Sequence, residues 1–281
     1  MRKIRNCTAG LLNTGSSKCP IEYKHIKGAI VVEHGITLPD TLDSQTLEEK
    51  CHADRPDRLY PISTFVEYSK DGGTPQVSAV GYGGNQVSSY NARTDTFTLE
   101  KYSEQLAAQI SRVMNAKFDV FYWDEHNRIY GVRGNDGSLH GFPMSTIYPD
   151  ATPHPTSGDV ATLTVNFCHS DAQLSIEKFD FIELDFDPSE FAIGLTEVEL
   201  LKTGDGDNKY KLVEKIGGYD LTERYGQQLA DKATTALVGA TSCTYDEEAK
   251  VLTIVPAASA KPALAKASVL YTNKIVGIEA V

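Results

Sequence analysis

The feature that most constrains this fold is a two-residue period of apolar and polar side chains, which begins near Leu59 and recurs through much of the remaining chain. Such alternation is typical of antiparallel strands that bury one face of a sheet. Turn-forming residues separate the alternating segments, and the pair Asp136-Gly137 supplies the positive φ of a tight hairpin. The sequence therefore predicts a mainly β protein, a β-sandwich or a barrel-like arrangement of antiparallel sheets.

One helix is expected to flank these sheets. A single apolar stripe with helical spacing is formed by Leu99, Tyr102, Leu106, Ile110 and Val113. Thr98 is the predicted N-cap, and Phe97 is expected to pack on Tyr102 as a hydrophobic staple. We predict a helix over residues 98–116 that covers one face of a sheet.

Changes in composition divide the chain into three regions. Residues 1–55 are rich in turn formers and are predicted to be an N-terminal arm, with a short strand at Ile26–Val32 and a short helix at Asp43–Ala53. Such arms usually lie on a neighbouring molecule or stay mobile. Residues 56–190 are predicted to form the β-sandwich core, which includes a three-stranded meander from Phe118 to Phe142.

Residues 191–281 are predicted to form a β-rich C-terminal lobe with α+β additions. Two hairpins are expected there, and a weakly signalled helix is expected to start at Asp220. Two further strands, Val269–Tyr271 and Ile275–Ile278, are predicted to close the chain.

A long glycine-rich loop is expected within the core region, at residues 72–90. It contains little that could fill a core, so it needs a surface outside itself to pack on. A phosphate-binding loop is disfavoured because neither a Lys-Ser/Thr pair nor a helix start follows the glycines. We predict a flap that contacts neighbouring subunits. The candidate interface residues are Gly72, Gly73, Gly81, Tyr82, Gly83, Gly84 and Tyr90.

Charge and hydropathy exclude several classes of protein. The chain has 27 Lys and Arg against 38 Asp and Glu, a net charge of −11, so its average surface repels phosphate and argues against a general nucleic-acid binder. No segment approaches the ~18 consecutive apolar residues of a membrane helix. No secretory apolar region follows Arg2, Lys3 and Arg5, so we expect neither membrane insertion nor export.

The cysteines and acidic clusters predict no metal or cofactor. Five cysteines are too few and too scattered for a disulfide framework, so we expect reduced thiols. A zinc site would need Cys7, Cys19, His25 and His34, which lack a closely spaced chelating pair. The acidic turn that starts at Asp205 lacks the Glu that would close a calcium-binding loop.

No catalytic motif emerges, and we predict that the protein is not an enzyme. Cys168 and His169 are adjacent on a predicted strand and therefore point to opposite faces, which we interpret as a buried thiol beside a surface imidazole. The turn that holds Asp124 and His126 has an ordinary turn composition, and Trp123 beside it is expected in the core. A run of four carboxylates interleaved with apolar residues predicts a solvated strand face: Asp180, Glu183, Asp185 and Asp187.

The order of these elements resembles a known family. A hairpin with a long loop precedes the predicted helix, the meander FDVFYWDEHNRIYGVRGNDGSLHGF and the alternating strand ATLTVNF. Over Leu59–Asp187 this order is similar to that of the tail-tube and neck-ring proteins of tailed bacteriophages. The terminal segments NCTAGLLNTGSSKCP and VLYTNKIVGIEAV also resemble phage or prophage structural proteins. The resemblance implies a β-sandwich flanked by a helix, assembly into six-fold rings around a DNA channel, and no catalytic residues.

We therefore expect a virion structural protein, made in the host cytoplasm, that assembles into rings of a tail tube, neck or hub. An acidic channel would let DNA pass without sequence-specific binding, and other virion proteins would be partners. Two alternatives stay open. A carbohydrate-binding β module would use exposed aromatic residues such as Tyr82, Tyr90, Tyr122 or Trp123. A carboxylate-dependent glycoside hydrolase would use acids within Asp180–Asp187.

Overall fold

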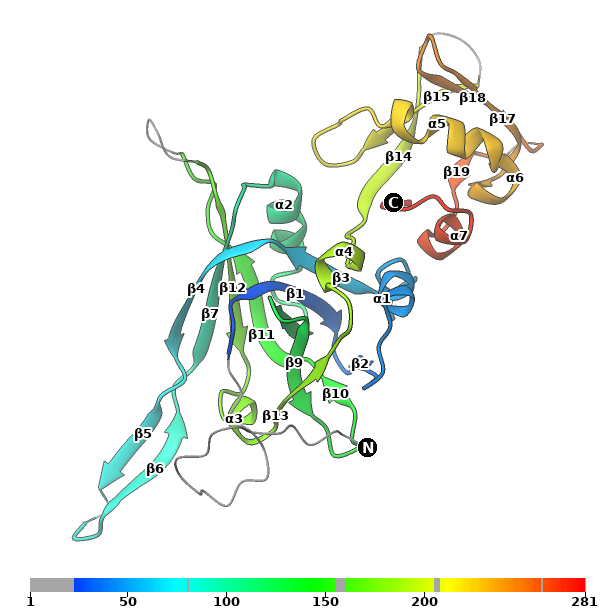
Figure 1. Cartoon of the computed structure of the whole chain (residues 1–281). Coiled ribbons are helices and arrows are strands. Elements are labelled where there is room, and N and C mark those ends of the chain that lie inside the picture. Colours follow the sequence, from blue (N-terminus) through cyan, green and yellow to red (C-terminus); the bar gives the residue numbers. More distant parts are fainter. Residues whose placement is uncertain (1–22, 80, 155–159, 205–207, 259, 281) are drawn as a thin grey trace.

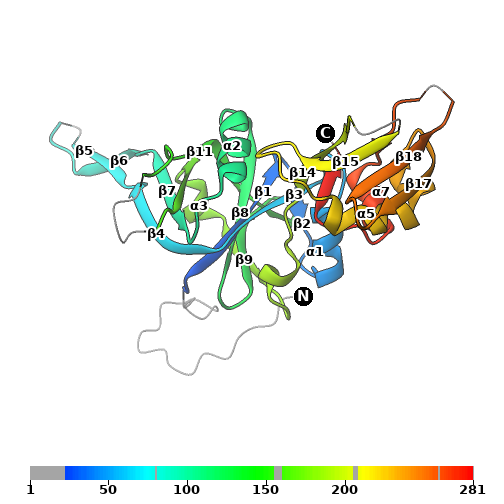
Figure 2. The same ribbon diagram turned by 90° about the horizontal axis from the view of Figure 1, so that it is seen from above.

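The computed structural model describes residues 23–79, 81–154, 160–204, 208–258 and 260–280. The chain is mainly β, with several antiparallel sheets and a few short helices, as the alternation predicts (Figure 1). A body and a C-terminal lobe lie side by side, and a thin two-stranded ribbon projects from the body on the side opposite the lobe (Figure 2).

The body contains an eleven-stranded sheet with the order β2-β10-β9-β8-β11-β12-β7-β4, in which β1 also pairs with β8 and β3, and β13 pairs with β9. Its strands are β1 (Ile26–Glu33), β2 (Thr37–Leu38), β3 (Leu59–Ser63), β4 (Phe65–Gly72), β7 (Arg93–Leu99), β8 (Phe118–Asp124), β9 (Arg128–Arg133), β10 (Leu139–His140), β11 (Phe142–Pro149), β12 (Leu163–His169) and β13 (Phe179–Glu183). In the described part of the body, the helices are α1 (Ser44–Cys51), α2 (Glu104–Val113), α3 (Leu174–Glu177) and α4 (Pro188–Phe191).

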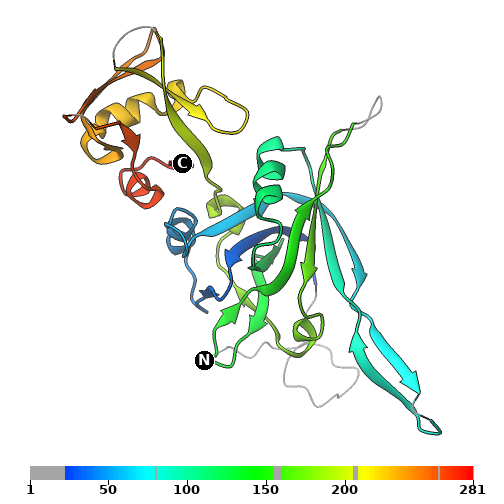
Figure 3. The same ribbon diagram turned by 180° about the vertical axis from the view of Figure 1, so that it is seen from behind.

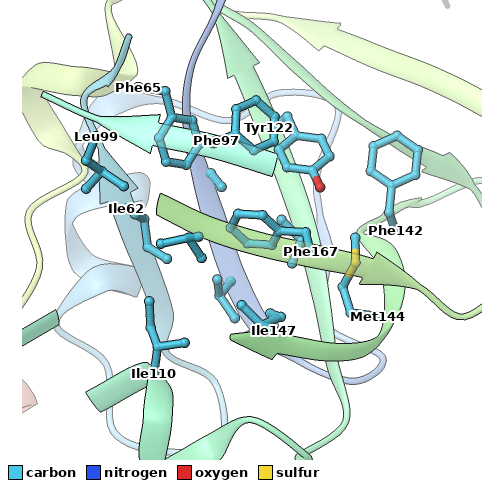
Figure 4. Close-up of a cluster of buried hydrophobic side chains, with 14 of the residues drawn as sticks. Ile62, Phe65, Phe97, Leu99, Ile110, Tyr122, Phe142, Met144, Ile147 and Phe167 are labelled. Atoms are coloured by element: carbon cyan, nitrogen blue, oxygen red, sulfur yellow. The ribbon is translucent and has the colours of Figure 1, made fainter. Parts of the chain in front are cut away.

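Two hydrophobic clusters occupy opposite faces of the central strands. On β1, Ala29 and Val31 belong to one cluster, whereas Ile30 and Val32 belong to the other. The first cluster is built around the rings of several strands, including Phe65, Phe97, Tyr122 and Phe167 (Figure 4). The second contains Trp123, which is fully buried. Strands that are covered on both faces have nearly continuous apolar sequences, which explains why β1 shows little alternation of apolar and polar residues.

The predicted N-terminal arm is wrong for its described part, residues 23–55. β1 lies between β3 and β8 in the middle of the sheet, and Leu47 and Cys51 of α1 are buried in the second cluster. The turn-rich composition that suggested an arm belongs to residues 1–22, which lie outside the described residues.

The flanking helix starts later than predicted. Thr98 is not an N-cap, because it lies in β7, whose inward residues Asp95, Phe97 and Leu99 follow the two-residue period of a strand. Helix α2 begins after Ser103, whose Oγ accepts a hydrogen bond from the Leu106 N–H at 3.3 Å. Leu99 fits both the helical stripe and the strand alternation, and the strand prevails because its side chain is buried in the sheet core.

The C-terminal lobe has its own core and a five-stranded sheet with the order β17-β18-β15-β14-β20. The sheet strands are β14 (Thr196–Lys202), β15 (Lys209–Glu214), β17 (Ala240–Asp246), β18 (Val251–Pro256) and β20 (Ile278–Ala280), and β16 (Leu237–Val238) pairs separately with β19 (Ala263–Leu264). Its helices are α5 (Thr222–Asp231), α6 (Ala233–Ala236) and α7 (Ala267–Thr272). Both predicted hairpins are present, β14–β15 and β17–β18.

The predicted strand Val269–Tyr271 is wrong, because these residues lie in helix α7. A short apolar run has no period long enough to separate a strand from a helix, and here Leu270 is a buried residue of a short helix. The final strand, β20, covers Ile278–Ala280 and pairs in parallel with β14, so it lies a few residues later than predicted.

Polar contacts join the lobe to the body. Arg58 forms an ion pair with Glu279, and both side chains are largely buried. The Gly277 N–H donates to His52 Nε2 at 3.2 Å, and the His52 ring stacks on Tyr271 with centroids 4.6 Å apart. Burial lowers the pKa of His52, which favours the neutral ring that can accept this bond.

Candidate functional site

The projecting ribbon has two halves that differ in their surroundings. The proximal ribbon consists of β4 and β7. Phe65 pairs with Leu99 at its inner end, and Gly72 pairs with Arg93 at its outer end. The distal ribbon consists of β5 (Pro75–Ala79), β6 (Asn85–Tyr90) and the tip that joins them. It continues the proximal strands outward and points away from the body (Figures 1 and 3).

Glycines form the joint between the two halves. Gly72 and Gly73 have φ of +69° and +68°, and a methyl group on Gly72 would lie 1.8 Å from the Ala92 carbonyl oxygen. The Gly73 N–H donates to that oxygen at 3.1 Å, and the Asn91 backbone N–H donates to the Thr74 carbonyl oxygen at 2.9 Å. Two of the predicted interface glycines therefore shape the joint, whereas the other predicted residues lie at the tip or at the end of β6.

The distal ribbon is exposed and uncharged. Every described residue from 75 to 89 is exposed, and the cross-strand pair Val77 and Val87 is 53% and 56% exposed. Tyr82 at the tip is completely exposed. No Asp, Glu, Lys or Arg occurs from 72 to 92, although 23% of the chain is charged. Natural edge strands are usually protected by charges, which this ribbon lacks.

A two-stranded ribbon with no core of its own is at best marginally stable in water. The distal ribbon satisfies the backbone hydrogen bonds between its two strands but buries no side chain among its described residues. Its geometry is therefore suited to contact with another surface.

A buried charged cluster holds the proximal ribbon. Asp95 accepts hydrogen bonds from Arg93 Nε and Nη2 at 3.0 and 2.8 Å and from the Tyr68 hydroxyl at 3.0 Å. His169 Nε2 lies 2.6 Å from Asp95 Oδ2. Burial alone would raise the pKa of Asp95, but the bonds and charges of His169 and Arg93 lower it overall. Burial and the neighbouring Asp95 raise the pKa of Tyr68 to about 12.

The sequence-based interpretation of Cys168 and His169 is reversed. They do point to opposite faces of β12, but the His169 side chain is 1% exposed, whereas Cys168 is half-buried next to Thr94. Asp95 on the neighbouring strand holds the imidazole inside. Cys51 and Cys243 are buried free thiols, and burial raises their pKa to about 12 and about 11.

The carboxylates proposed for a hydrolase have structural partners. Asp180 is buried and accepts from Arg133 Nε at 2.8 Å, so the predicted solvated face is wrong for this residue. Glu183 accepts from Arg128 Nε at 3.4 Å, and Asp187 caps α4 by accepting from the Ser189 N–H at 2.8 Å. Asp185 is exposed.

The turn after β8 has the structural role expected from its composition. Asp124 accepts from the backbone N–H groups of His126 and Arg128 at 2.8 and 3.0 Å and from the Tyr130 hydroxyl at 2.5 Å. Of the aromatic residues considered for carbohydrate binding, Tyr122 and Trp123 are buried, Tyr90 is half-buried and Tyr82 is exposed.

Among the described residues, no group of three or more His, Cys, Asp or Glu is placed to hold a metal ion. Cys7, Cys19 and the turn at Asp205 lie outside the described residues. None of the helices in the described ranges is long and apolar enough to cross a bilayer.

Comparisons with known proteins leave the family open. No family model matches the chain, and no curated protein matches it. A chain in the six-fold symmetrised cryo-EM structure of the anti-feeding prophage baseplate is similar over 60% of this chain and 99% of its own length. The identity is 12% and the TM-score is 0.27. This is a coarse resemblance to a prophage baseplate chain, and it defines no shared family.

Proposed function

We propose that this chain is a non-catalytic structural protein that assembles from many copies through its distal ribbon. The observation that carries the proposal is the ribbon itself, an uncharged two-stranded segment that stands outside the body and is exposed at every described residue from 75 to 89. Apolar groups and strand edges presented in this way gain stability when a neighbouring molecule covers them.

The mode of assembly follows from the shape of the protomer. A projecting ribbon that contacts a different surface of the next copy makes a heterologous interface, and such interfaces close into rings or extend into filaments. The resemblance of Leu59–Asp187 to tail-tube and neck-ring proteins favours a ring of a phage-type virion, with six-fold symmetry. The ring would belong to a tail tube, neck or hub and would be made in the host cytoplasm.

The acidic composition suits a channel for DNA. With a net charge of −11, the ring repels phosphate groups from its average surface, so DNA passes without sequence-specific binding. Other virion proteins would contact the surfaces that the ring leaves free.

The mass of the particles that the purified full-length chain forms in solution tests this proposal. We expect the wild-type protein to form oligomers of ring size in native mass spectrometry and electron microscopy. The double substitution Val77→Lys and Val87→Lys places two like charges opposite each other on the distal ribbon and should leave monomers.

The matched control is Val238→Lys with Val255→Lys, which changes two valines of the C-terminal lobe that are 58% and 44% exposed. This variant should assemble like the wild type. A wild-type chain that stays monomeric at high concentration would refute the proposal, as would a ribbon variant that assembles normally.

A further inference from the structure

An aromatic cavity opens in the body at the root of the ribbon. Its volume is about 650 Å³, and its walls come from strands that are far apart in the sequence. Five of the rings that line it are Phe97, Tyr122, Tyr130, Phe142 and Phe179. Tyr122 lies 5.2 Å from Phe97 and 5.6 Å from Phe142, and Tyr130 stacks on Phe179 at 5.6 Å, measured between ring centroids.

One polar atom in this wall has no partner. Among the described residues the Tyr122 hydroxyl is buried and makes no hydrogen bond. Buried hydroxyl groups are almost always hydrogen-bonded, because leaving one unpaired costs free energy. The cavity therefore presents an apolar aromatic surface, and the unpaired Tyr122 hydroxyl is enclosed within its wall.

The rings give the cavity a mainly apolar wall that suits an aromatic group. Charged residues also line it: Arg93 and Asp95 are paired with each other at 2.8 Å, and Lys24, Lys27 and Glu67 contribute charges of both signs. Aromatic rings pack favourably against other rings in offset or edge-to-face geometry, and a tyrosine adds a hydroxyl group that can donate or accept a hydrogen bond.

The same chain carries a group with these properties. Tyr82 is completely exposed at the tip of the distal ribbon, within the sequence Gly81-Tyr82-Gly83-Gly84. An ideal Cβ built on Gly81 or Gly84 has no atom within 4 Å, so the described surroundings leave space around the tyrosine. The tip has no charged residue and points away from its own body, so it cannot reach the cavity of the same copy (Figures 1 and 3).

We propose that Tyr82 of one copy inserts into the aromatic cavity of the next copy. This inference rests on the proposed assembly and names its two contact surfaces. Tyrosines that fill a pocket at the centre of an interface commonly carry much of the binding energy. The contact is heterologous, because the tip and the cavity are different surfaces, and it therefore repeats from one copy to the next around a ring.

Two single substitutions test the tip and the cavity independently. Tyr82→Ala removes the inserted side chain and leaves the cavity intact. Val66→Trp fills the mouth of the cavity and leaves the tip intact, because Val66 lines the cavity and is 58% exposed. Each variant should weaken self-association by about tenfold or more in sedimentation velocity experiments. The controls are Tyr219→Ala and Val238→Trp, which change residues of the C-terminal lobe that are 63% and 58% exposed.

Mixing the two variants gives the most specific result. The Tyr82→Ala chain retains a cavity and the Val66→Trp chain retains a tip, so together they should form a 1:1 dimer that cannot grow further. If the wild-type chain assembles but both variants assemble equally well, the insertion is refuted while assembly through the ribbon stands. If the variants are monomeric and their mixture forms no dimer, the pairing of these two surfaces is also refuted. A wild-type chain that never assembles refutes both proposals.

Discussion

The two halves of the ribbon have the same antiparallel pairing but different side-chain packing. The proximal half buries Phe65, Phe97 and Leu99 in the body core and anchors Asp95 in a charged cluster. In the distal half, the described side chains of β5 and β6 are all exposed except Tyr90, which is half-buried. The difference shows that the distal half has interstrand hydrogen bonds without a side-chain core. The proposed assembly would supply the missing stabilisation through contacts with neighbouring copies.

The largest expected difference between the halves is in core packing. Phe97→Ala removes a ring that contacts several others and should lower the free energy of unfolding by about 4 kcal/mol. Val87→Ala in the distal half should change it by less than about 0.5 kcal/mol. Urea unfolding of dilute, monomeric protein measures both values. Equal losses of unfolding free energy from the two substitutions would contradict the proposed difference in packing between the two halves.

The charged cluster gives the next largest effect. Asp95→Asn leaves the buried His169 and the half-buried Arg93 without their carboxylate and should destabilise the protein by about 3 kcal/mol. Asp71→Asn changes an exposed acid on the same ribbon and should have little effect. Thermal unfolding of the two variants provides the comparison, and a small effect at Asp95 would contradict the role assigned to the cluster.

The glycine joint between the halves should tolerate substitution poorly. Gly72→Ala places a methyl group against the Ala92 carbonyl oxygen at a positive φ and should cost about 2 kcal/mol. Gly84→Ala at the tip has open space and should cost less than about 1 kcal/mol. Denaturation midpoints distinguish these outcomes, and a neutral Gly72→Ala would show that the joint is not constrained.

Lowering the pH should gradually remove the contribution of Asp95 to the stability of the proximal half. Because the folded-state pKa of Asp95 is below that of the unfolded chain, its contribution is fully present above about pH 4 and is lost as the pH falls through the folded value. A single group changes stability by at most about 1.4 kcal/mol per pH unit. The stability difference between the wild type and Asp95→Asn should therefore shrink below pH 4. A constant difference down to pH 2 would contradict this assignment.

Local patterns predicted the parts of the fold in which one residue period dominates. The meander and both C-terminal hairpins follow from alternation and turn residues. The start of α2 was predicted wrongly, because Leu99 fits two periods. The strand at Ile26–Val32 was predicted, but its place between β3 and β8 was not, because that pairing joins segments distant in sequence. The reversal of Cys168 and His169 depends on Asp95, which is distant in sequence.

The candidate site was predictable only in part. Glycines and a lack of core residues predicted a protruding loop at 72–90, and they mark it in the structure. A signal for the buried cluster was also present, since Asp95 shares the inward face of β7 with Phe97 and Leu99. The aromatic cavity had no local signal, because its walls come from several distant segments of the chain.

Hydrogen–deuterium exchange of the ribbon amides across a dilution series tests the central claim most directly. In concentrated protein, we expect the amides of both ribbon halves to exchange slowly, because neighbouring copies cover the distal strands. On dilution to monomers, the distal amides should exchange rapidly while the proximal amides remain protected by the body. Distal protection that is the same at every concentration would show that the ribbon is stable without a neighbour and would contradict the account.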